Sequence, residues 1–331
     1  MWPAAKICKA MKQHIYVASR TDEGGILHCL LDENGKLRVQ GHYPAKSPAW
    51  LCRDGQTLYA LLREPFLLNS GIIRFSIHGD GSLEPIAGLA STHGTIGAHI
   101  YAEDGQVWCA NYINGTVTAV PDKLLPFNGR GADPARQSSS HPHCICPTPD
   151  GRYLCVCDLG RDRIELITRE LEPVFSAAAP AGSGPRHLVF SGDGGYAYCS
   201  AELSSEVCVF SYADGKLNYL HSVSTLPEGC GLENSASAIR LSADGWRLYV
   251  SNRGHDSIAA FAVSGAELRP LGHIPSFGRS PRDFALAGDY LLCANELSNN
   301  VQVFSLKGET PATPVCTLAV PMPWCVLPVE I

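Results

Sequence analysis

A short strand-rich unit recurs along this chain, and no other feature of the sequence restricts the fold as strongly. Its clearest copy, GPRHLVFSGDGGYAYCSAELSSEVCVF, runs from Gly184 to Phe210. An apolar run from Leu188 to Phe190 is followed by a turn signal at Asp193 and Gly194, and further apolar runs follow after further breaks. Short β-rich runs separated by Asp-Gly and Ser-rich breaks predict the strands of an antiparallel meander.

The unit returns at a regular period. Clear copies run from His143 to Ile167, from Ser237 to Phe261 and from Ser280 to Phe304, with looser ones from Pro48 to Phe75 and from Gly97 to Val120. Asp-Gly pairs begin at Asp54, Asp104, Asp150, Asp193 and Asp244, so that successive pairs lie between 43 and 51 residues apart. A period of this length is typical of blades of four strands rather than of helical repeats. The repeats therefore predict a β-propeller.

The two ends of the chain complete a seventh copy. His14 to Ser19, Gly25 to Leu31 and Leu37 to Tyr43 match the second, third and fourth strands of the unit, and Pro323 to Leu327 matches its first strand. The sequence thus predicts an all-β fold: a seven-bladed β-propeller of four-stranded antiparallel blades, closed by pairing of the N- and C-terminal strands in one blade. Closure removes the free sheet edges that a linear array would expose. Because no linker interrupts the repeats, we expect residues 1–331 to form a single domain.

Charge and hydropathy exclude several classes of function. The chain has a net charge of −6, a pI near 6.0 and no run of basic residues, so we expect no nucleic-acid partner. Lys6, Lys9 and Lys12 interrupt the N-terminal segment, which therefore does not resemble a secretory signal. No apolar run is long enough to span a bilayer. We expect a cytoplasmic protein without a membrane partner, present as a monomer or a weak homo-oligomer.

The fourteen cysteines raise the question of a zinc site. Several lie inside strand runs: Cys109, Cys155, Cys199, Cys208 and Cys293. A free thiol there behaves as a small buried hydrophobe, in keeping with a reducing cytosol. The pairs Cys144/Cys146 and Cys155/Cys157 could face a zinc ion from adjacent strands, but structural zinc sites usually space their thiolates across a turn. We therefore expect these cysteines to fill the core.

A divalent ion held by oxygen atoms is the other metal hypothesis. Four residues near the ends of second strands could form an oxygen ring: Asn111, Asp158, Asn252 and Asn295. Such residues more often cap strand ends. We expect no metal and no cofactor.

The repeat also predicts which side chains meet at the mouth of the central channel. The first strand of a blade lines the channel and the second runs antiparallel beside it, so the start of the first and the end of the second lie together. The starts are Pro48, Gly97, His143, Arg186, Ser237 and Arg282, and the ends are Arg20, Arg63, Ile113, Leu159, Glu202, Arg253 and Glu296. We expect His143, Arg186, Glu202 and Arg253, from three consecutive blades, to line one cavity.

Five short motifs of the repeats carry a resemblance to a known family. The ordered set HPH, GPRH, ELS, SNRGHDS and SPRDF resembles the lactonase family of seven-bladed β-propellers, over essentially the whole chain. The best-known activity of that family is 6-phosphogluconolactonase, and a fungal member interconverts carboxymuconate and its lactone. The resemblance implies a site of a histidine, arginines and a glutamate, which by position are His141 or His143, Arg186, Glu202 and Arg253. Two positions depart from the pattern, Ala238 and Glu296, and both bear on the substrate.

Opening a lactone requires an activated water, a partner for the oxyanion and an anchor for the substrate. Glu202 or His143 can take the proton of the water, with His141 as a third candidate, and the Arg186 guanidinium can reach the carbonyl oxygen. Arg253 and Arg282, with Arg20 or Arg63, suit a phosphate because a guanidinium donates as a planar fork. We count His141, Arg282, Arg20, Arg63 and Glu296 as substrate-binding candidates. The expected substrate is a small anionic sugar lactone, with 6-phosphogluconolactone as the leading choice.

Two other functions remain open on the sequence. A carboxymuconate cycloisomerase would use the same arginines to bind carboxylates, and would consume no water. A non-catalytic propeller that only binds partner proteins would instead need exposed apolar anchors around its rim. Outside the site, we expect His187 to point away from the mouth in a supporting position, and His255 and Asp256 to lie in a turn between the second and third strands.

Overall fold

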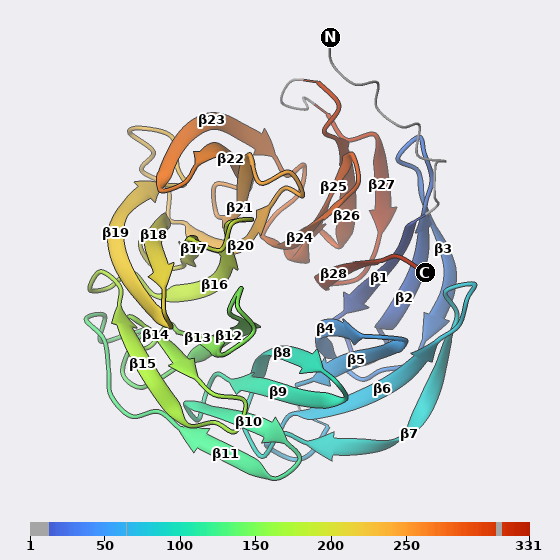
Figure 1. The fold of residues 1–331 in the computed structure, drawn as a ribbon. Coiled ribbons are helices and arrows are strands. Elements are labelled where there is room, and N and C mark those ends of the chain that lie inside the picture. The colour runs from blue at the N-terminus through green and yellow to red at the C-terminus, as the bar shows by residue number, and fades with distance from the viewer. Residues whose placement is uncertain (1–12, 64, 309–312) are drawn as a thin grey trace.

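A computed structural model describes residues 13–63, 65–308 and 313–331 of the chain. These residues form seven antiparallel sheets of four strands each, arranged as a ring around a central channel (Figure 1). The predicted propeller fold is confirmed. The segment with Lys6, Lys9 and Lys12 lies outside the described residues. No helix in the described part of the chain is long and apolar enough to cross a bilayer.

The blades are numbered I to VII in chain order, with strands given from the channel outward. Blade I contains β28 (Pro323–Val329), β1 (Gln13–Ser19), β2 (Gly25–Leu31) and β3 (Leu37–Tyr43). Blade II contains β4 (Pro48–Asp54), β5 (Thr57–Leu62), β6 (Gly71–Ile77) and β7 (Leu83–Ser91). Blade III contains β8 (Gly97–Glu103), β9 (Gln106–Asn111), β10 (Thr116–Val120) and β11 (Lys123–Pro126). Blade IV contains β12 (Pro142–Pro147), β13 (Leu154–Asp158), β14 (Arg163–Ile167) and β15 (Pro173–Ala178).

The other three blades follow the same order. Blade V contains β16 (Pro185–Phe190), β17 (Tyr196–Ala201), β18 (Glu206–Ala213) and β19 (Lys216–Ser224). Blade VI contains β20 (Ser235–Leu241), β21 (Arg247–Arg253), β22 (Ser257–Ser264) and β23 (Glu267–Pro275). Blade VII contains β24 (Pro281–Ala287), β25 (Tyr290–Asn295), the short 3-10 helix η1 (Glu296–Ser298), β26 (Asn300–Ser305) and β27 (Cys316–Ala319).

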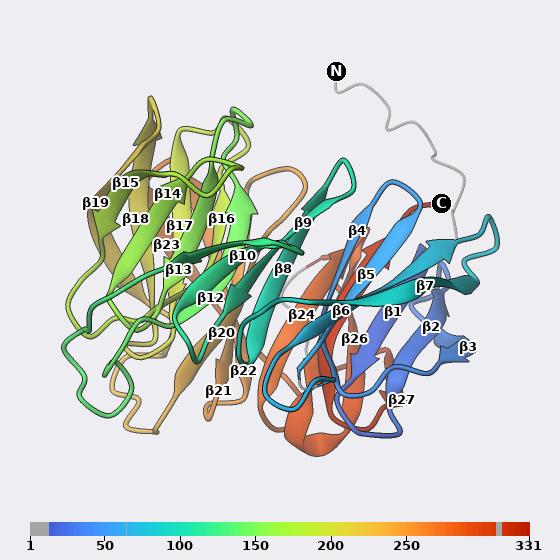
Figure 2. The ribbon, with the colours of Figure 1, turned by 90° about the horizontal axis from the view of Figure 1, so that it is seen from below.

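Burial falls from the middle of each blade to its outer edge. The second strands are almost wholly buried, as in β13 and β25, whereas the outermost strands, such as β19, consist mostly of exposed or half-buried residues. The strands run between the two faces of the ring, where the connecting turns lie (Figure 2). Side chains of one blade therefore pack on the next blade, and the core is divided among the blade interfaces.

The Asp-Gly pairs form the tight turns that the repeat predicts. In blade V, Asp193 Oδ1 accepts hydrogen bonds from Ser191 Oγ at 2.5 Å and from the backbone N–H of Gly195 at 3.0 Å. Gly194 has a φ of 73°, which favours glycine because it lacks a Cβ. The turn residues thus fix the register of the first two strands.

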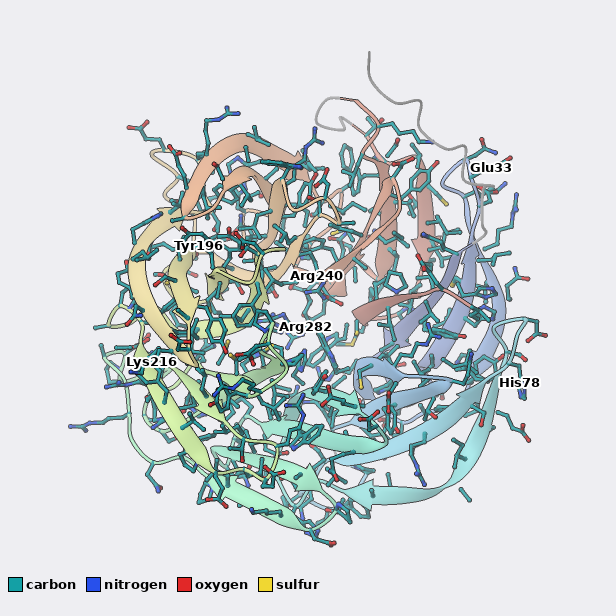
Figure 3. All side chains as sticks on the ribbon, viewed as in Figure 1. Glu33, His78, Tyr196, Lys216, Arg240 and Arg282 are labelled. Atoms are coloured by element: carbon teal, nitrogen blue, oxygen red, sulfur yellow. The ribbon has the colours of Figure 1, made fainter. Side chains whose placement is uncertain are left out.

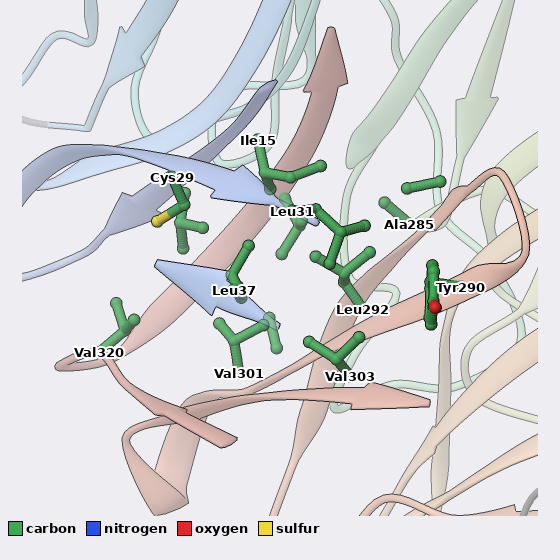
Figure 4. Packing of buried hydrophobic residues seen from close by; sticks show 14 residues of the cluster. Ile15, Cys29, Leu31, Leu37, Ala285, Tyr290, Leu292, Val301, Val303 and Val320 are labelled. Carbon is green, nitrogen blue, oxygen red and sulfur yellow. The ribbon is translucent and has the colours of Figure 1, made fainter. Parts of the chain in front are cut away.

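Blade I joins the two ends of the chain as predicted. Strand β1 pairs with β28, with Val17 opposite Val326, and with β2 on its other side. Ile15 and Val17 are fully buried in a cluster with Leu292 and Val301 of blade VII (Figure 4). The ring is therefore closed by hydrogen bonds within blade I and by apolar packing between blades I and VII.

Most of the cysteines in the described part of the chain are buried in the core, as expected. Five of them lie buried in one cluster between blades IV and V: Cys144, Cys155, Cys157, Cys199 and Cys208. Among the residues that the structure describes, no group of three or more His, Cys, Asp or Glu side chains is arranged to hold a metal ion. The zinc hypothesis for the Cys144/Cys146 and Cys155/Cys157 pairs therefore has no geometric support.

Candidate active site

A β-bulge lies near the start of the innermost strand of each blade. In β16, pairing with β17 passes from Pro185 opposite Ala201 to His187 opposite Ser200, so Arg186 is an extra residue. His143 of β12, Arg282 of β24 and Trp324 of β28 are extra in the same way, as are Ala49 and Ala98, and the shift in β20 spans Ser237 and Ala238. A bulge breaks the alternation of side chains and can redirect one of them.

Six of the extra residues line one cavity of about 230 Å³ at an end of the channel. They are Ala49, Ala98, His143, Arg186, Arg282 and Trp324, and the lining also includes Arg63, Tyr112, Arg136, His187, Glu202 and Arg253. Arg282 lies near the centre of the ring in Figure 3. The structure therefore brings His143, Arg186, Glu202 and Arg253 together at one cavity.

Glu202 and three arginines form one half of the lining, here called the glutamate cluster. Glu202 Oε2 accepts a hydrogen bond from Arg186 Nε at 3.0 Å and lies 2.8 Å from Arg253 Nη2. Glu202 Oε1 accepts a hydrogen bond from Arg136 Nη2 at 2.6 Å. Only 6% of the Glu202 side chain and 3% of the Arg186 side chain are exposed. Three guanidiniums against one carboxylate leave the cluster with excess positive charge.

The same charges control protonation within the cluster. Burial favours the neutral form of the Glu202 carboxyl, but Arg253 and Arg186 outweigh burial and hold its pKa well below the usual range. Burial, followed by the charge of Arg253, lowers the pKa of Arg186 to about 9. Glu202 therefore stays ionised at neutral pH.

His143 lies beside the cluster, and its Nδ1 makes no hydrogen bond within the described part of the chain. Burial, reinforced by the charge of Arg186, lowers the pKa of His143 well below its ordinary value, so its imidazole is neutral. Its ring meets those of Tyr112 and His187 edge to face, at 5.7 and 5.4 Å between centroids. His143 Nδ1 is buried without a hydrogen-bond partner among the described residues. A buried neutral imidazole that makes no structural hydrogen bond is available to a ligand.

Trp324, Arg63 and Arg282 form the other half of the lining, and together with Arg20, which stacks on Trp324, they are here called the tryptophan subsite. The guanidinium carbons of Arg282, Arg20 and Arg63 lie 3.6, 4.0 and 5.0 Å from the Trp324 ring centroid. Cations stack favourably on an indole, which helps to hold these like charges together. Arg282 Nη1 is paired with Glu296 Oε2 at 3.3 Å. Burial and the charge of Arg253 lower the pKa of Arg282 to about 10.

Three sequence-predicted residues support the cavity rather than line it. The His141 ring stacks on Tyr112 at 4.5 Å between centroids, and its Nδ1 donates to the Tyr112 carbonyl at 2.7 Å. Arg20 stacks on Trp324, and Glu296 pairs with Arg282. Arg63 and Arg282 do line the cavity.

The expectation for His187 is wrong. Its side chain lines the cavity, and its Nε2 accepts a hydrogen bond from Arg186 Nη1 at 3.1 Å. Simple alternation along β16 would send Arg186 and His187 to opposite faces. The bulge at Arg186 removes that alternation, and both side chains reach the cavity.

Sequence reasoning missed Trp324, Tyr112 and Arg136. A signal for Trp324 existed, because Pro323 and Trp324 align with Pro185 and Arg186 of the clearest repeat. Arg136 comes from the connection between β11 and β12, where no other repeat has a counterpart. The repeat pattern therefore had no means of finding it.

The four oxygen-bearing residues considered for a metal are committed to hydrogen bonds within the protein. Asn111 donates to Thr116 and Thr118, Asn252 donates to the Thr225 carbonyl, and Asn295 donates to the Ser276 carbonyl. Asp158 accepts hydrogen bonds from Ser140 and from the His141 N–H. All four are fully buried, and they fix the loops at the strand ends.

Comparison with known proteins gives consistent results at the level of family. The model of a family described as "Lactonase, 7-bladed beta-propeller" matches residues 14–328. An uncharacterised protein of Staphylococcus epidermidis is 36% identical over 324 residues, covering 89% of this chain and 93% of that protein. A solved Lactobacillus plantarum protein has a TM-score of 0.88 and 30% identity, covering 97% of this chain and 100% of the other.

Two further solved structures carry functional descriptions. One is a candidate 6-phosphogluconolactonase of Bacteroides fragilis, with a TM-score of 0.87, 27% identity and coverage of 99% of this chain and 100% of the other. The second is a periplasmic gluconolactonase of Pseudomonas aeruginosa, with a TM-score of 0.86, 27% identity and coverage of 97% and 100%.

Glu202→Gln tests the electrostatic structure of the cavity. The substitution keeps the shape but leaves three guanidiniums without their carboxylate, so we expect it to lower the free energy of unfolding by about 3–5 kcal/mol. Glu172→Gln is the matched control, because Glu172 pairs with Lys123 at 3.1 Å while 68% of its side chain is exposed. That change should cost less than about 1 kcal/mol. Urea denaturation measures both, and equally small effects would contradict the description.

Proposed function

The chain belongs to the lactonase family of seven-bladed β-propellers, and we propose that it hydrolyses the ester bond of a sugar lactone in this cavity. One observation carries the proposal: a buried, neutral His143 lies beside the glutamate cluster, in which three guanidiniums surround one carboxylate. Such a site offers a proton acceptor for water and positive charge for an oxyanion, which are the two needs of ester hydrolysis.

His143 is the general base in this proposal. Glu202 is bound by Arg136, Arg186 and Arg253, and a carboxylate whose pKa they hold so low is a weak base. His141 is turned toward the Tyr112 carbonyl. Burial is the larger cause of the lowered pKa of His143, and the charge of Arg186 adds to it. An anionic substrate offsets the charge of Arg186, and so raises that pKa in part. Substrate binding therefore makes His143 a stronger base.

The reaction then runs in two steps. His143 removes a proton from water as the water oxygen bonds to the lactone carbonyl carbon, and the carbonyl oxygen takes up the negative charge. Arg186 has five N–H donors, of which the contacts with Glu202 and His187 use two, so others remain for the oxyanion. When the ring C–O bond breaks, the imidazolium returns its proton to the leaving oxygen. The product is a hydroxy acid, which ionises at neutral pH.

The tryptophan subsite favours a lactone that carries a phosphate. Arg20, Arg63 and Arg282 bring three guanidiniums to one indole ring, with Glu296 as the carboxylate paired with Arg282. Guanidiniums bind phosphate oxygens through paired donors. We therefore propose 6-phosphogluconolactone as the substrate, and a cytoplasmic location in which this intermediate of carbohydrate metabolism is formed. The solved relatives described as acting on gluconolactones agree with this substrate class.

The two alternatives receive less support. A cycloisomerase could use the same arginines, but it needs no base to activate water, and the uncommitted His143 suits that role. An interaction module is favoured by exposed apolar side chains at this end, such as Leu67 and Leu297. It has no need, however, for buried charges inside the channel, which are costly unless they serve a purpose.

Hydrolysis measured above the spontaneous background, with and without the substrate phosphate, tests the proposed substrate. We expect kcat/KM to be higher for 6-phosphogluconolactone than for gluconolactone. Arg282→Gln should reduce kcat/KM for the phosphorylated lactone by about tenfold or more, because it removes a charge-assisted hydrogen bond to the phosphate. Gluconolactone has no phosphate, so its kcat/KM should fall far less. Equal loss for both lactones would contradict phosphate binding at the tryptophan subsite. If neither lactone were hydrolysed faster than the spontaneous background, the proposed function would be rejected.

The pH dependence of kcat/KM tests the protonation of His143. A base works only when it is unprotonated, so kcat/KM falls as pH drops through the pKa of the free enzyme. Burial and Arg186 hold that pKa well below 6.5, so we expect kcat/KM to stay level from pH 8 to pH 6 and to decline only in more acidic solution. If kcat/KM, after subtraction of the background rate, fell to half its maximum near pH 6.5, the pKa of His143 would have its ordinary value, which would contradict this account.

A further inference from the structure

Arg136 reaches the cavity from outside the repeats. The connection that carries it runs from residue 127 to 141 between β11 and β12, and it is longer than any other connection between neighbouring blades. Gln137 anchors this connection: its Nε2 donates to the Leu159 carbonyl and to Asp162, at 2.8 and 2.7 Å, and its Oε1 accepts the N–H of Asp133 at 2.8 Å. Gln137 is fully buried. The backbone beside Arg136 is therefore fixed, and only its side chain extends into the mouth.

The Arg136 side chain differs from its two partners in exposure. It is 43% exposed, against 3% for Arg186 and 16% for Arg253, although all three contact Glu202. Arg136 also lines a second, more open depression outside the cavity, as does Arg253, whereas Arg186 does not. An ion pair at the solvent boundary is weakened by screening, whereas a buried one is costly to break. Of the three arginines, Arg136 can exchange Glu202 for another anion at the lowest cost.

The proposed reaction supplies such an anion. A lactone is neutral at its carbonyl carbon, and hydrolysis leaves a carboxylate at the same place. That new carboxylate forms beside Glu202, and two neighbouring carboxylates repel unless a cation lies between them. Arg186 and Arg253 already hold Glu202 Oε2, while Arg136 is the one described residue that holds Oε1.

We propose that Arg136 is the residue that binds the carboxylate of the ring-opened product, by turning its guanidinium from Glu202 Oε1 toward that group. This inference rests on the proposed function and extends it. Arg136 then determines how tightly the aldonate is held, and has little effect on the neutral lactone ring. Because the residue stands at the boundary between cavity and outer depression, it also lies on a path by which the aldonate can leave.

Equilibrium binding of sodium gluconate, measured by calorimetry on the full chain, tests the inference without turnover. The matched ligand is D-glucitol, which has the same polyhydroxy chain and no carboxylate. In Arg136→Gln we expect the Kd for gluconate to rise by about tenfold or more, the usual effect of losing a hydrogen bond between charged groups, with no change for glucitol. Arg130→Gln is the matched control, since Arg130 lies exposed in the same connection and lines neither the cavity nor the depression. It should bind gluconate like the wild type.

Several outcomes would overturn the inference. The first is that the wild-type protein binds gluconate no more tightly than glucitol. The second is that the Arg136→Gln protein binds gluconate as tightly as the wild type. If Arg136 acted only by placing Glu202, KM for gluconolactone would rise in parallel with the Kd for gluconate, whereas we expect KM to change less than about threefold. If Arg136→Gln protein fails to fold, Arg136→Lys provides the test instead. Lysine keeps the positive charge but lacks the paired N–H donors of the guanidinium, so it should weaken gluconate binding, but by less than about tenfold. Absence of hydrolysis together with Arg136-dependent gluconate binding would reject the proposed function and leave the carboxylate site standing.

Discussion

The structure depends on one backbone feature repeated around a closed ring: the extra residue near the start of each innermost strand. A regular strand sends alternate side chains to its two faces, and both faces of a propeller blade pack on neighbouring blades. In six of the seven blades the bulge frees one residue from that packing and turns it toward the channel. In blades IV, V and VII this residue is His143, Arg186 and Arg282. Closure of blade I by β28 adds Trp324 to the same circle.

A buried group of arginines is stable only if its charge is compensated. Glu202 provides the compensating negative charge in one half of the cavity, where it contacts Arg136, Arg186 and Arg253. The Trp324 ring and Glu296 provide it in the other half. Compensation is incomplete in the glutamate cluster, where one carboxylate faces three guanidiniums, and an anionic substrate and its oxyanion would neutralise the remaining positive charge. The arrangement that costs stability is therefore the one that the proposed chemistry uses.

Much of the fold and part of the site could be predicted from the sequence. The repeats gave the blades, their closure and the positions of Arg186 and Glu202, because a shared register puts equivalent residues at equivalent places. The bulges could not be predicted, and this is why the sequence points to Pro48 where Ala49 lines the cavity, and why the expectation for His187 is wrong. Arg136 lies in a connection whose path is set by Gln137 and its tertiary contacts rather than by any local pattern.

The central claim is that the cavity around Glu202 opens a lactone by placing positive charge on the oxyanion, and Arg186 is the residue through which it does so. The most direct measurement is the enzyme-dependent rate of lactone opening by Arg186→Ala, in protein whose fold is verified by circular dichroism. The account predicts a kcat lower by about 100-fold or more, the usual effect of removing one oxyanion donor. A kcat equal to that of the wild type would contradict it.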